Sequence, residues 1–246
     1  MVRGLYTGAS GMQAQLHRMD ALSNNLANVN TTGYKKDTSV QKAFPELLLS
    51  RTNDSGVRRH PFGSSDSAPI VGKLGTGVEY NESFTVFEQG SLQETTNPFD
   101  FALEDKGFFT IDTPYGERYT RNGSFTLGKE GMLLTKEGYP VMGENGPINI
   151  KKNNFMVKIV GFEKDRHIKK LGSSLWGATE NSGAAEILMG ESRPKVSQGF
   201  IEMSNVNPVY EMVNLITVNR AYEANQKVIS SQDSMTGKLI DNVARA

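Results

Sequence analysis

The chain has 246 residues, of which 37% are hydrophobic, and its 27 basic and 27 acidic side chains give a formal net charge of zero. This length suits one large domain or two small ones, and the missing basic surplus argues against a protein that binds nucleic acid. The sequence contains no cysteine, which excludes disulfides, thiolate metal sites and cysteine nucleophiles.

The N-terminal residues do not have the pattern of a membrane span or a cleavable secretory signal. No run of 18 apolar residues occurs in the sequence, and residues 1–19 contain Arg3, His17 and Arg18 without a continuous apolar centre. We therefore expect no direct membrane insertion, and we expect any export to proceed without a cleaved signal peptide.

Apolar or small residues near the N-terminus recur at alternating steps of four and three. This seam consists of Leu5, Ala9, Met12, Leu16, Met19 and Leu26, with Ser23 as its polar gap. A 3.5-residue repeat predicts a helix with a narrow coiled-coil seam. The helix should end where asparagine and glycine accumulate, at Asn24, Asn25, Asn28, Asn30 and Gly33. A helix stop needs only one or two asparagines, so we also expect a subunit contact there.

The C-terminal segment begins with a helix-start pattern. Asn207 can cap the helix, Pro208 fits its first position, and Glu211 complements the helix dipole. The seam that follows consists of Val218, Ala221, Asn225, Val228, Gln232, Met235 and Leu239, and a neighbouring line consists of Leu215, Tyr222 and Ile229. The two polar seam positions, Asn225 and Gln232, could face solvent or form hydrogen bonds that set the register of paired helices.

The middle of the chain, residues 78–203, has the pattern of β-strands. Phe108 to Ile111 and Tyr119-Thr120 flank a turn at residues 113–116, and Asn122-Gly123 is typical of a two-residue hairpin. Arg121 and Asn122 are interpreted as sheet-edge and turn residues. Further turns at short intervals predict an antiparallel domain with a barrel-like or sandwich core. Residues 50–73, rich in Ser, Gly, Asp, Arg and Pro, predict an extended arm.

Together these patterns predict an α+β fold, in which long N- and C-terminal helices pair as a coiled coil around a central, mostly antiparallel β domain with an extended linker arm. The expected divisions are an N-terminal helix at 1–32, the arm at 33–77, the β-rich domain at 78–203 and a C-terminal helix at 204–246 that packs on the first. Each helix has a seam too narrow to be buried against one partner. Packing between repeated copies would bury both seams, which is typical of a polymer-forming protein.

Enzyme motifs are absent from the sequence. The three histidines, His17, His60 and His167, have no metal-ligand spacing with one another. The fragment Gly75-Thr76-Gly77 lacks the third glycine and following helix of a phosphate site, and no Gly-x-Ser-x-Gly motif occurs. We expect no enzymatic activity, no cofactor and no metal.

Four segments resemble the signatures of the bacterial flagellar rod and hook protein family. Residues 23–35 (SNNLANVNTTGYK) resemble its N-terminal signature, and residues 199–209 (GFIEMSNVNPV) and 219–225 (NRAYEAN) resemble its C-terminal signature. Residues 107–109 (GFF) and 119–125 (YTRNGSF) are similar to its central β motif. Residues 138–148 (GYPVMGENGPI) and the chain length favour the proximal-rod branch (FlgF type), with the distal-rod branch (FlgG type) as the alternative. Residues 150–162 look shorter than the family pattern.

The resemblance implies a structural subunit of the flagellar basal-body rod, which polymerises helically through its terminal helices to build the axial drive shaft for motility. It implies partners: other copies of the chain, the neighbouring rod proteins proximal and distal to it, and the flagellar export apparatus. Its location would be the periplasmic rod, reached through the flagellar secretion channel. The terminal helices would become ordered only on assembly. The alternatives are a hook or junction scaffold or cap, and an adhesin or secreted binding module.

The expected assembly interface combines seam and asparagine positions. It comprises Leu5, Met12, Leu16, Met19, Asn24, Asn25, Leu26, Asn28, Asn30, Asn205, Asn207, Val218, Tyr222, Asn225, Val228, Met235 and Leu239.

Overall fold

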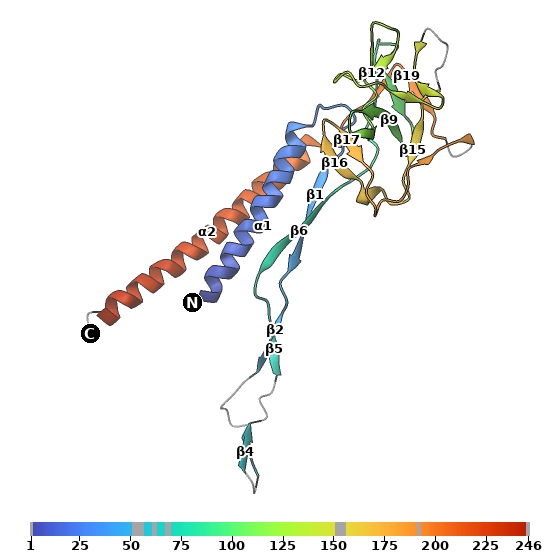
Figure 1. The fold of residues 1–246 in the computed structure, drawn as a ribbon. Coiled ribbons are helices and arrows are strands. Elements are labelled where there is room, and N and C mark those ends of the chain that lie inside the picture. Colours follow the sequence, from blue (N-terminus) through green and yellow to red (C-terminus); the bar gives the residue numbers. More distant parts are fainter. Residues whose placement is uncertain are drawn as a thin grey trace. The chain divides into compact units, whose positions relative to one another are not determined.

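The computed structural model of the protein describes residues 2–50, 57–60, 63–66, 70–150, 156–190 and 193–244. The predicted α+β class is confirmed, because two long helices, α1 (Val2–Ala27) and α2 (Pro208–Ala244), flank a succession of strands in the chain (Figure 1). The chain divides into two compact units. We call them the helical unit (Met1–Ala21, Ser39–Ser83 and Asn214–Ala246) and the sheet unit (Leu22–Thr38 and Phe84–Val213).

Both helices end or begin where the sequence predicts. Helix α1 ends at Ala27, and the side-chain amide of Asn28 donates to the carbonyl oxygen of Asn24 at 2.8 Å. At the start of α2 the Asn207 Oδ1 atom accepts hydrogen bonds from the backbone amides of Val209 (3.1 Å) and Tyr210 (3.2 Å). These bonds satisfy two amides that have no partner within the helix, so the predicted N-cap is confirmed.

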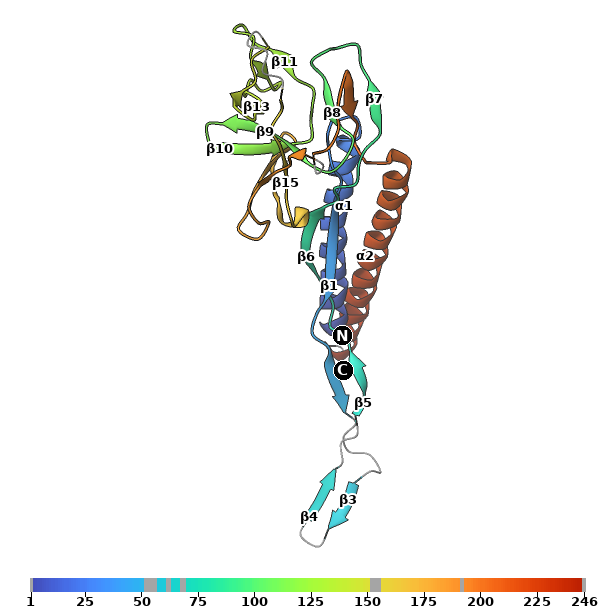
Figure 2. The ribbon, with the colours of Figure 1, turned by 90° about the vertical axis from the view of Figure 1, so that its right-hand side faces the viewer.

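Paired strands occupy the described residues between α1 and the central sheet. Strand β1 (Asp37–Ala43) pairs with β6 (Val78–Thr85), as Figure 2 shows. Strand β2 (Leu47–Ser50) pairs antiparallel with β5 (Ile70–Leu74), and β3 (Val57–His60) pairs antiparallel with β4 (Gly63–Asp66). Residues 51–56, 61–62 and 67–69 of the predicted arm lie outside the described residues.

A six-stranded antiparallel sheet forms the centre of the sheet unit, with the strand order β16-β17-β10-β9-β15-β18. The predicted hairpin at residues 113–116 is confirmed, because Thr113 and Gly116 are partners at its closed end and Gly116 has φ +100°. The strands are β9 (Phe108–Thr113), β10 (Gly116–Thr120), β15 (Ile159–Gly161), β16 (Lys169–Gly172), β17 (Leu175–Gly177) and β18 (Glu186–Ile187).

Four short antiparallel ladders and the 3₁₀ turn η2 also belong to the described part of the sheet unit. The ladders are β7 (Leu92–Glu94) with β20 (Phe200–Glu202), β8 (Phe101–Leu103) with β19 (Val196–Gln198), β11 (Thr126–Leu127) with β12 (Leu133–Leu134), and β13 (Met142–Gly143) with β14 (Gly146–Pro147). The 3₁₀ turn η2 covers Asp165–His167.

Two apolar clusters form the core of this unit, and strand β9 contributes to both. Successive side chains of a strand point to opposite faces, so Phe109 packs in one cluster and Phe108 in the other. The first cluster consists of Leu103, Phe109, Phe125, Leu133, Val141, Ile148, Val157 and Ile159. The second consists of Phe108, Tyr119, Val160, Phe162, Ile168 and Trp176.

The prediction of a hairpin turn at Asn122-Gly123 is wrong. Neither residue has a positive φ, which both central residues of that turn would require. Asn122 Oδ1 instead accepts the Thr32 hydroxyl at 2.8 Å, and a Cβ atom on Gly123 would contact the carbonyl oxygen of Phe101. The dipeptide is thus required by contacts with other segments, not by a local turn.

Neither described helix has a stretch that is both long and apolar enough to cross a membrane.

Candidate assembly interface

Helices α1 and α2 approach each other at glycine residues of α1. A Cβ atom on Gly8 would lie 3.0 Å from Ile229 Cγ1, and one on Gly11 would lie 2.9 Å from Asn225 Nδ2. Because these distances are shorter than ordinary van der Waals contact, a side chain at either position would require the facing side chain of α2 to move. In both ribbon views the two helices lie side by side within the helical unit (Figures 1 and 2).

The polar seam positions of α2 lie on this side of the helix. Asn225 faces Gly11, and a Cβ atom on Gly4 would contact Gln232 Nε2. The sequence left open whether Asn225 and Gln232 face solvent. Both side chains are half-buried and lie against α1, so neither is fully exposed to solvent.

The predicted apolar seam of α1 lies beside the glycine line. Positions 5, 12 and 19 each follow by one residue the line through positions 4, 11 and 18, which is a rotation of about 100° around the helix. Leu5, Met12 and Met19 are half-buried, and Leu16 is 44% exposed. Leu26, in the sheet unit, is also half-buried. The seam therefore keeps apolar surface that the chain itself does not cover.

The predicted seam of α2 divides into a buried and an exposed set. Val218 is buried and Tyr222 is half-buried. Val228, Met235 and Leu239 are 48%, 62% and 51% exposed. The last three residues are large and apolar, and they remain accessible to another molecule.

A second exposed apolar stripe at the start of α2 was missed by the sequence analysis. It consists of Val209, Met212, Val213 and Ile216. Val209 and the buried Val218 are nine residues apart, which is about half a turn around the helix at 100° per residue. Met212 and Val213 follow Val209, and precede Ile216, by three or four positions in the sequence, as expected for one face of a helix. These four residues lie on a different line along α2 from the predicted seam of Val218, Val228, Met235 and Leu239.

Two of the predicted interface asparagines serve the interior of the sheet unit. The buried Asn25 donates through Nδ2 to the Asp37 carbonyl oxygen (2.9 Å), and its Oδ1 accepts from the Asp37 amide (2.9 Å) and the Tyr34 hydroxyl (3.1 Å). Asn205 Oδ1 accepts the Lys36 amide at 2.8 Å, and its Nδ2 donates to the Val86 carbonyl oxygen at 2.9 Å. These bonds account for both residues without a neighbouring subunit.

The other three asparagines of the N-terminal run, Asn24, Asn28 and Asn30, line a polar groove of about 670 Å³. Lys170 and Ser173 also line this groove, and Ser173 belongs to a turn with positive φ at two successive serines. Asn24 and Asn30 are exposed there, so they are available for an external contact.

Tyr34, which also lines this groove, is buried next to charged side chains. The Lys170 Nζ atom lies 4.0 Å from the centre of its ring and 2.8 Å from Asp37 Oδ2. Burial, followed by the nearby carboxylates of Asp37 and Glu211, raises the pKa of the Tyr34 hydroxyl well above its ordinary value.

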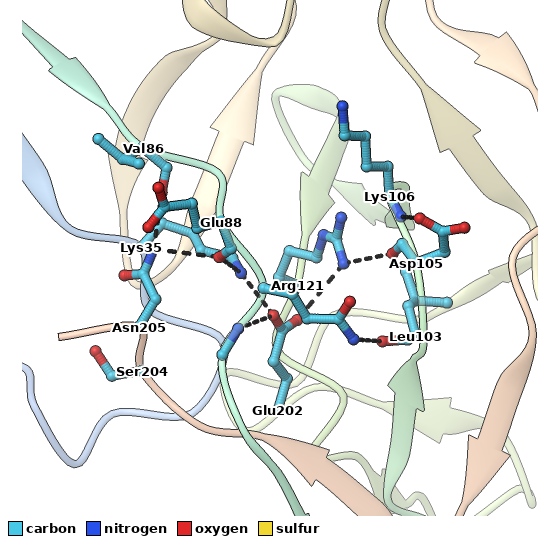
Figure 3. Close-up of polar contacts among 12 residues, drawn as sticks. Lys35, Val86, Glu88, Leu103, Asp105, Lys106, Arg121, Glu202, Ser204 and Asn205 are labelled. Carbon is cyan, nitrogen blue, oxygen red and sulfur yellow. Dashed lines mark hydrogen bonds and ion pairs between the residues drawn. The ribbon is translucent and has the colours of Figure 1, made fainter. Parts of the chain in front are cut away.

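A buried charge cluster lies at the meeting point of the signature segments (Figure 3). Lys35 Nζ lies 2.5 Å from Glu202 Oε1 and donates to the Glu88 carbonyl oxygen at 2.6 Å. Arg121 Nη1 lies 3.6 Å from Glu202 Oε2 and donates to the Asp105 carbonyl oxygen at 2.8 Å. Since Arg121 is almost fully buried, its interpretation as a sheet-edge residue is wrong.

The three charged residues of this cluster come from three separate signatures. Lys35 ends the N-terminal one, Arg121 lies in the central β motif, and Glu202 lies in the C-terminal one. Burial lowers the pKa of both Lys35 and Arg121, and the Glu202 carboxylate opposes this shift by favouring their charged forms. Segments that are distant in the sequence therefore converge on one ion-pair cluster.

Comparison with known protein families gives three matches along the chain. Residues 5–35 match the family described as "Flagella basal body rod protein". Residues 102–161 match "Flagellar hook protein FlgE/F/G D1 domain", and residues 197–242 match "Flagellar basal body rod FlgEFG protein C-terminal". The matches cover most of α1, strands β9, β10 and β15 of the central sheet, and most of α2.

Whole-length relatives agree with these matches. The chain is 34% identical over 271 aligned positions to the flagellar basal-body rod protein FlgG of Borreliella burgdorferi, with 100% of both chains covered. It is 33% identical to FlgG of Buchnera aphidicola subsp. Acyrthosiphon pisum, covering 97% of this chain and 99% of the relative. It is 32% identical to the flagellar hook-basal body complex protein FlhO of Bacillus subtilis, with 100% of both chains covered. With identities of this size over its whole length, the chain belongs to the family of flagellar basal-body rod proteins.

Proposed function

We propose that the chain is a structural subunit of the flagellar basal-body rod that polymerises helically through its terminal helices and has no enzymatic activity. The observation that carries this proposal is the apolar surface left exposed on α1 and α2, at Leu16, Val228, Met235 and Leu239. Burial of such surface stabilises an interface by about 25 cal/mol per Å² before the losses of association are counted.

In the proposed assembly, α1 and α2 of one chain pair as a coiled coil through the glycine side of α1. The exposed seam residues then pack against neighbouring copies. Contacts that join different surfaces of successive copies extend into an open helical filament instead of closing a dimer. The division into terminal helices at 1–32 and 204–246, an arm at 33–77 and a β-rich domain at 78–203 is part of this proposal.

The proposed partners are other copies of the chain, the rod proteins proximal and distal to it, and the flagellar export apparatus. The proposed location is the periplasmic rod, reached through the flagellar secretion channel without a cleaved signal peptide. A net charge of zero supports self-association, because long-range repulsion between copies is weak. The groove lined by Asn24, Asn28 and Asn30 is the proposed polar part of the subunit contact.

Two branches of the family are candidates for the position of the subunit in the rod. Residues 138–148 favour the proximal branch (FlgF type), whereas relatives named FlgG support the distal branch. The alignment with the Borreliella protein has 271 positions against 246 residues here, so at least 25 positions (271 − 246) lack a residue in this chain. The shortened stretch predicted at residues 150–162 is one candidate for part of this difference.

The direct test of the interface is to replace a seam residue with aspartate. Leu16→Asp and Val228→Asp should abolish incorporation into rods, because a charge would be buried between copies. Gln226→Asp, at an exposed polar position of α2, is the matched control and should incorporate normally. Fluorescence of Trp176, the single tryptophan, shows whether the sheet unit stays folded. Normal incorporation of both seam variants would refute the proposed interface.

Imaging of flagellar motors in cells that lack the gene tests the wider proposal. Motors should retain the membrane ring and stop at a stub of rod, and the length of the stub distinguishes the proximal from the distal position. Complete motors with filaments would instead favour a scaffold, cap or adhesin.

A further inference from the structure

The two ends of the sheet-unit chain contact each other directly. The Gly33 amide donates to the Glu202 carbonyl oxygen at 2.8 Å, and the Lys36 amide donates to Asn205 Oδ1 at 2.8 Å. Between these bonds, the ammonium group of Lys35 pairs with the carboxylate of Glu202, although 167 residues separate them in the sequence. A short N-terminal segment and a short C-terminal segment thus share three polar contacts.

Each end also depends on groups from the middle of the chain. Glu202 Oε1 accepts the Gly90 amide at 2.9 Å, and Lys35 Nζ donates to the Glu88 carbonyl oxygen. A Cβ atom on Gly90 would contact the Met203 carbonyl oxygen, so the backbones are packed without space for a side chain or water. On the other side of the carboxylate, Arg121 Nη1 lies 3.6 Å from Glu202 Oε2.

Because the cluster is buried, each of its charged groups needs the oppositely charged partner to remain in place. The side chains of Lys35, Glu202 and Arg121 are 0%, 1% and 3% exposed. Removal of one partner from a buried ion pair is much more destabilising than loss of an exposed pair, because the remaining charge has no water to solvate it. Withdrawal of residues 31–37 would leave the Glu202 carboxylate with the Gly90 amide and the Arg121 guanidinium, and without the ammonium group of Lys35. Withdrawal of residues 200–207 would remove the carboxylate of Glu202, with which both buried cations form ion pairs.

We propose that Lys35, Arg121 and Glu202 form a two-ended clasp, through which residues 31–37 and residues 200–207 join and leave the sheet unit together. The clasp follows from these contacts alone. Its role in export, described next, rests on the proposed function. A chain that must unfold to pass a secretion channel would release both ends of the sheet unit in one event when either end is pulled. Conversely, the sheet unit cannot complete its folding until the chain has been synthesised as far as Glu202.

Amide hydrogen exchange on the full chain tests the clasp, with two adjacent lysines as a matched pair. Lys35→Met keeps the length of the side chain and removes its charge, and exchange in residues 200–206 should accelerate by about 100-fold. Lys36→Met removes a cation whose partner is the exposed Glu88 carboxylate at 3.4 Å, and it should leave exchange in residues 200–206 unchanged. Amides of the β9–β10 hairpin report whether the rest of the unit stays folded.

Glu202→Gln provides the reciprocal measurement and the milder variant. It keeps an acceptor for the Gly90 amide, so it decides the question if Lys35→Met does not fold. Exchange in residues 31–37 should accelerate while the β9–β10 hairpin stays protected. Acceleration confined to the mutated segment, with the opposite end unchanged in both variants, would overturn the clasp. This outcome would leave the rod proposal intact, because the measurement involves no assembly.

Discussion

The two units of the chain place polar and apolar groups in opposite ways. The sheet unit buries a lysine, an arginine and a glutamate together with two apolar clusters. The α2 part of the helical unit instead leaves Val228, Met235 and Leu239 about half exposed. A buried ion cluster is satisfied only by its own specific partners, whereas an exposed apolar face gains stability when another surface covers it. The charges of the buried cluster are therefore satisfied within one chain, whereas the exposed apolar face of the helical unit would gain stability from a neighbouring copy.

The largest expected effect is the difference in stability between an alanine substitution in the core of the sheet unit and one on the exposed face of α2. Trp176 is fully buried against Phe87 and Phe108, so Trp176→Ala should lower the free energy of unfolding of the sheet unit by about 3–5 kcal/mol. Leu239→Ala removes a half-exposed side chain and should change the stability of the free chain by less than about 0.5 kcal/mol. Urea denaturation followed by far-UV circular dichroism measures both. A destabilised Leu239→Ala monomer would break the comparison.

A second prediction concerns the glycine side of α1. Gly8→Leu would place a side chain where Ile229 already lies, and should destabilise the pairing of α1 with α2 by about 1–3 kcal/mol. Ala9→Leu, at the exposed neighbouring position, should be nearly neutral, because alanine and leucine are both strong helix formers. Thermal unfolding at the helix signal distinguishes the two. Equal melting of both variants would show that the glycines are not needed for close approach.

The asparagine run gives a sharper version of the same comparison. Asn25→Ala removes the three hydrogen bonds of a buried side chain and should lower the free energy of unfolding by about 1–3 kcal/mol. Asn30→Ala, at an exposed position, should change it by less than about 0.5 kcal/mol. If Asn25→Ala instead kept full stability but stopped rod incorporation, Asn25 would be an interface residue after all.

The smallest effect is an alkaline one in the sheet unit. Burial raises the pKa of Tyr34 above its ordinary value near 10, so the folded state favours the neutral phenol. This contribution is fully present below about pH 10 and is lost as the pH rises further, because the unfolded chain ionises first. Tyr34→Phe should therefore lose stability less steeply than the parent above about pH 10, and Tyr115→Phe, 84% exposed, should not differ from the parent. Identical slopes for all three in denaturation curves would contradict this assignment.

Local patterns of the sequence predicted local structure well. The Asn207 cap, the end of α1 and the Thr113 to Gly116 hairpin each depend on neighbouring residues, and all three are found. Asn122-Gly123 was misread because its bonding partners, Thr32 and Phe101, lie elsewhere in the chain. Arg121 was misread for the same reason. A pattern search cannot show that a polar residue has a buried partner 80 or more positions away, as Arg121 has in Glu202.

The 3.5-residue spacing in the sequence identified the seams of both helices, but it did not show which surface each seam contacts. Spacing shows which residues share a side of a helix, yet it does not show which side the same chain covers. In α1 the side that faces α2 carries glycines, because small residues allow the closest approach of two backbones. Large residues beside them were correctly placed in the seam, and their role between copies stays a prediction.

The glycines of α1 have a consequence for when this helix exists at all. Each glycine lowers helix propensity by about 1 kcal/mol relative to alanine, so Gly4, Gly8 and Gly11 together weaken an isolated α1 by about 3 kcal/mol. The same residues create the flat surface on which α2 fits. An isolated α1 is therefore expected to be a weak helix, and contact with α2 is expected to offset this loss of propensity.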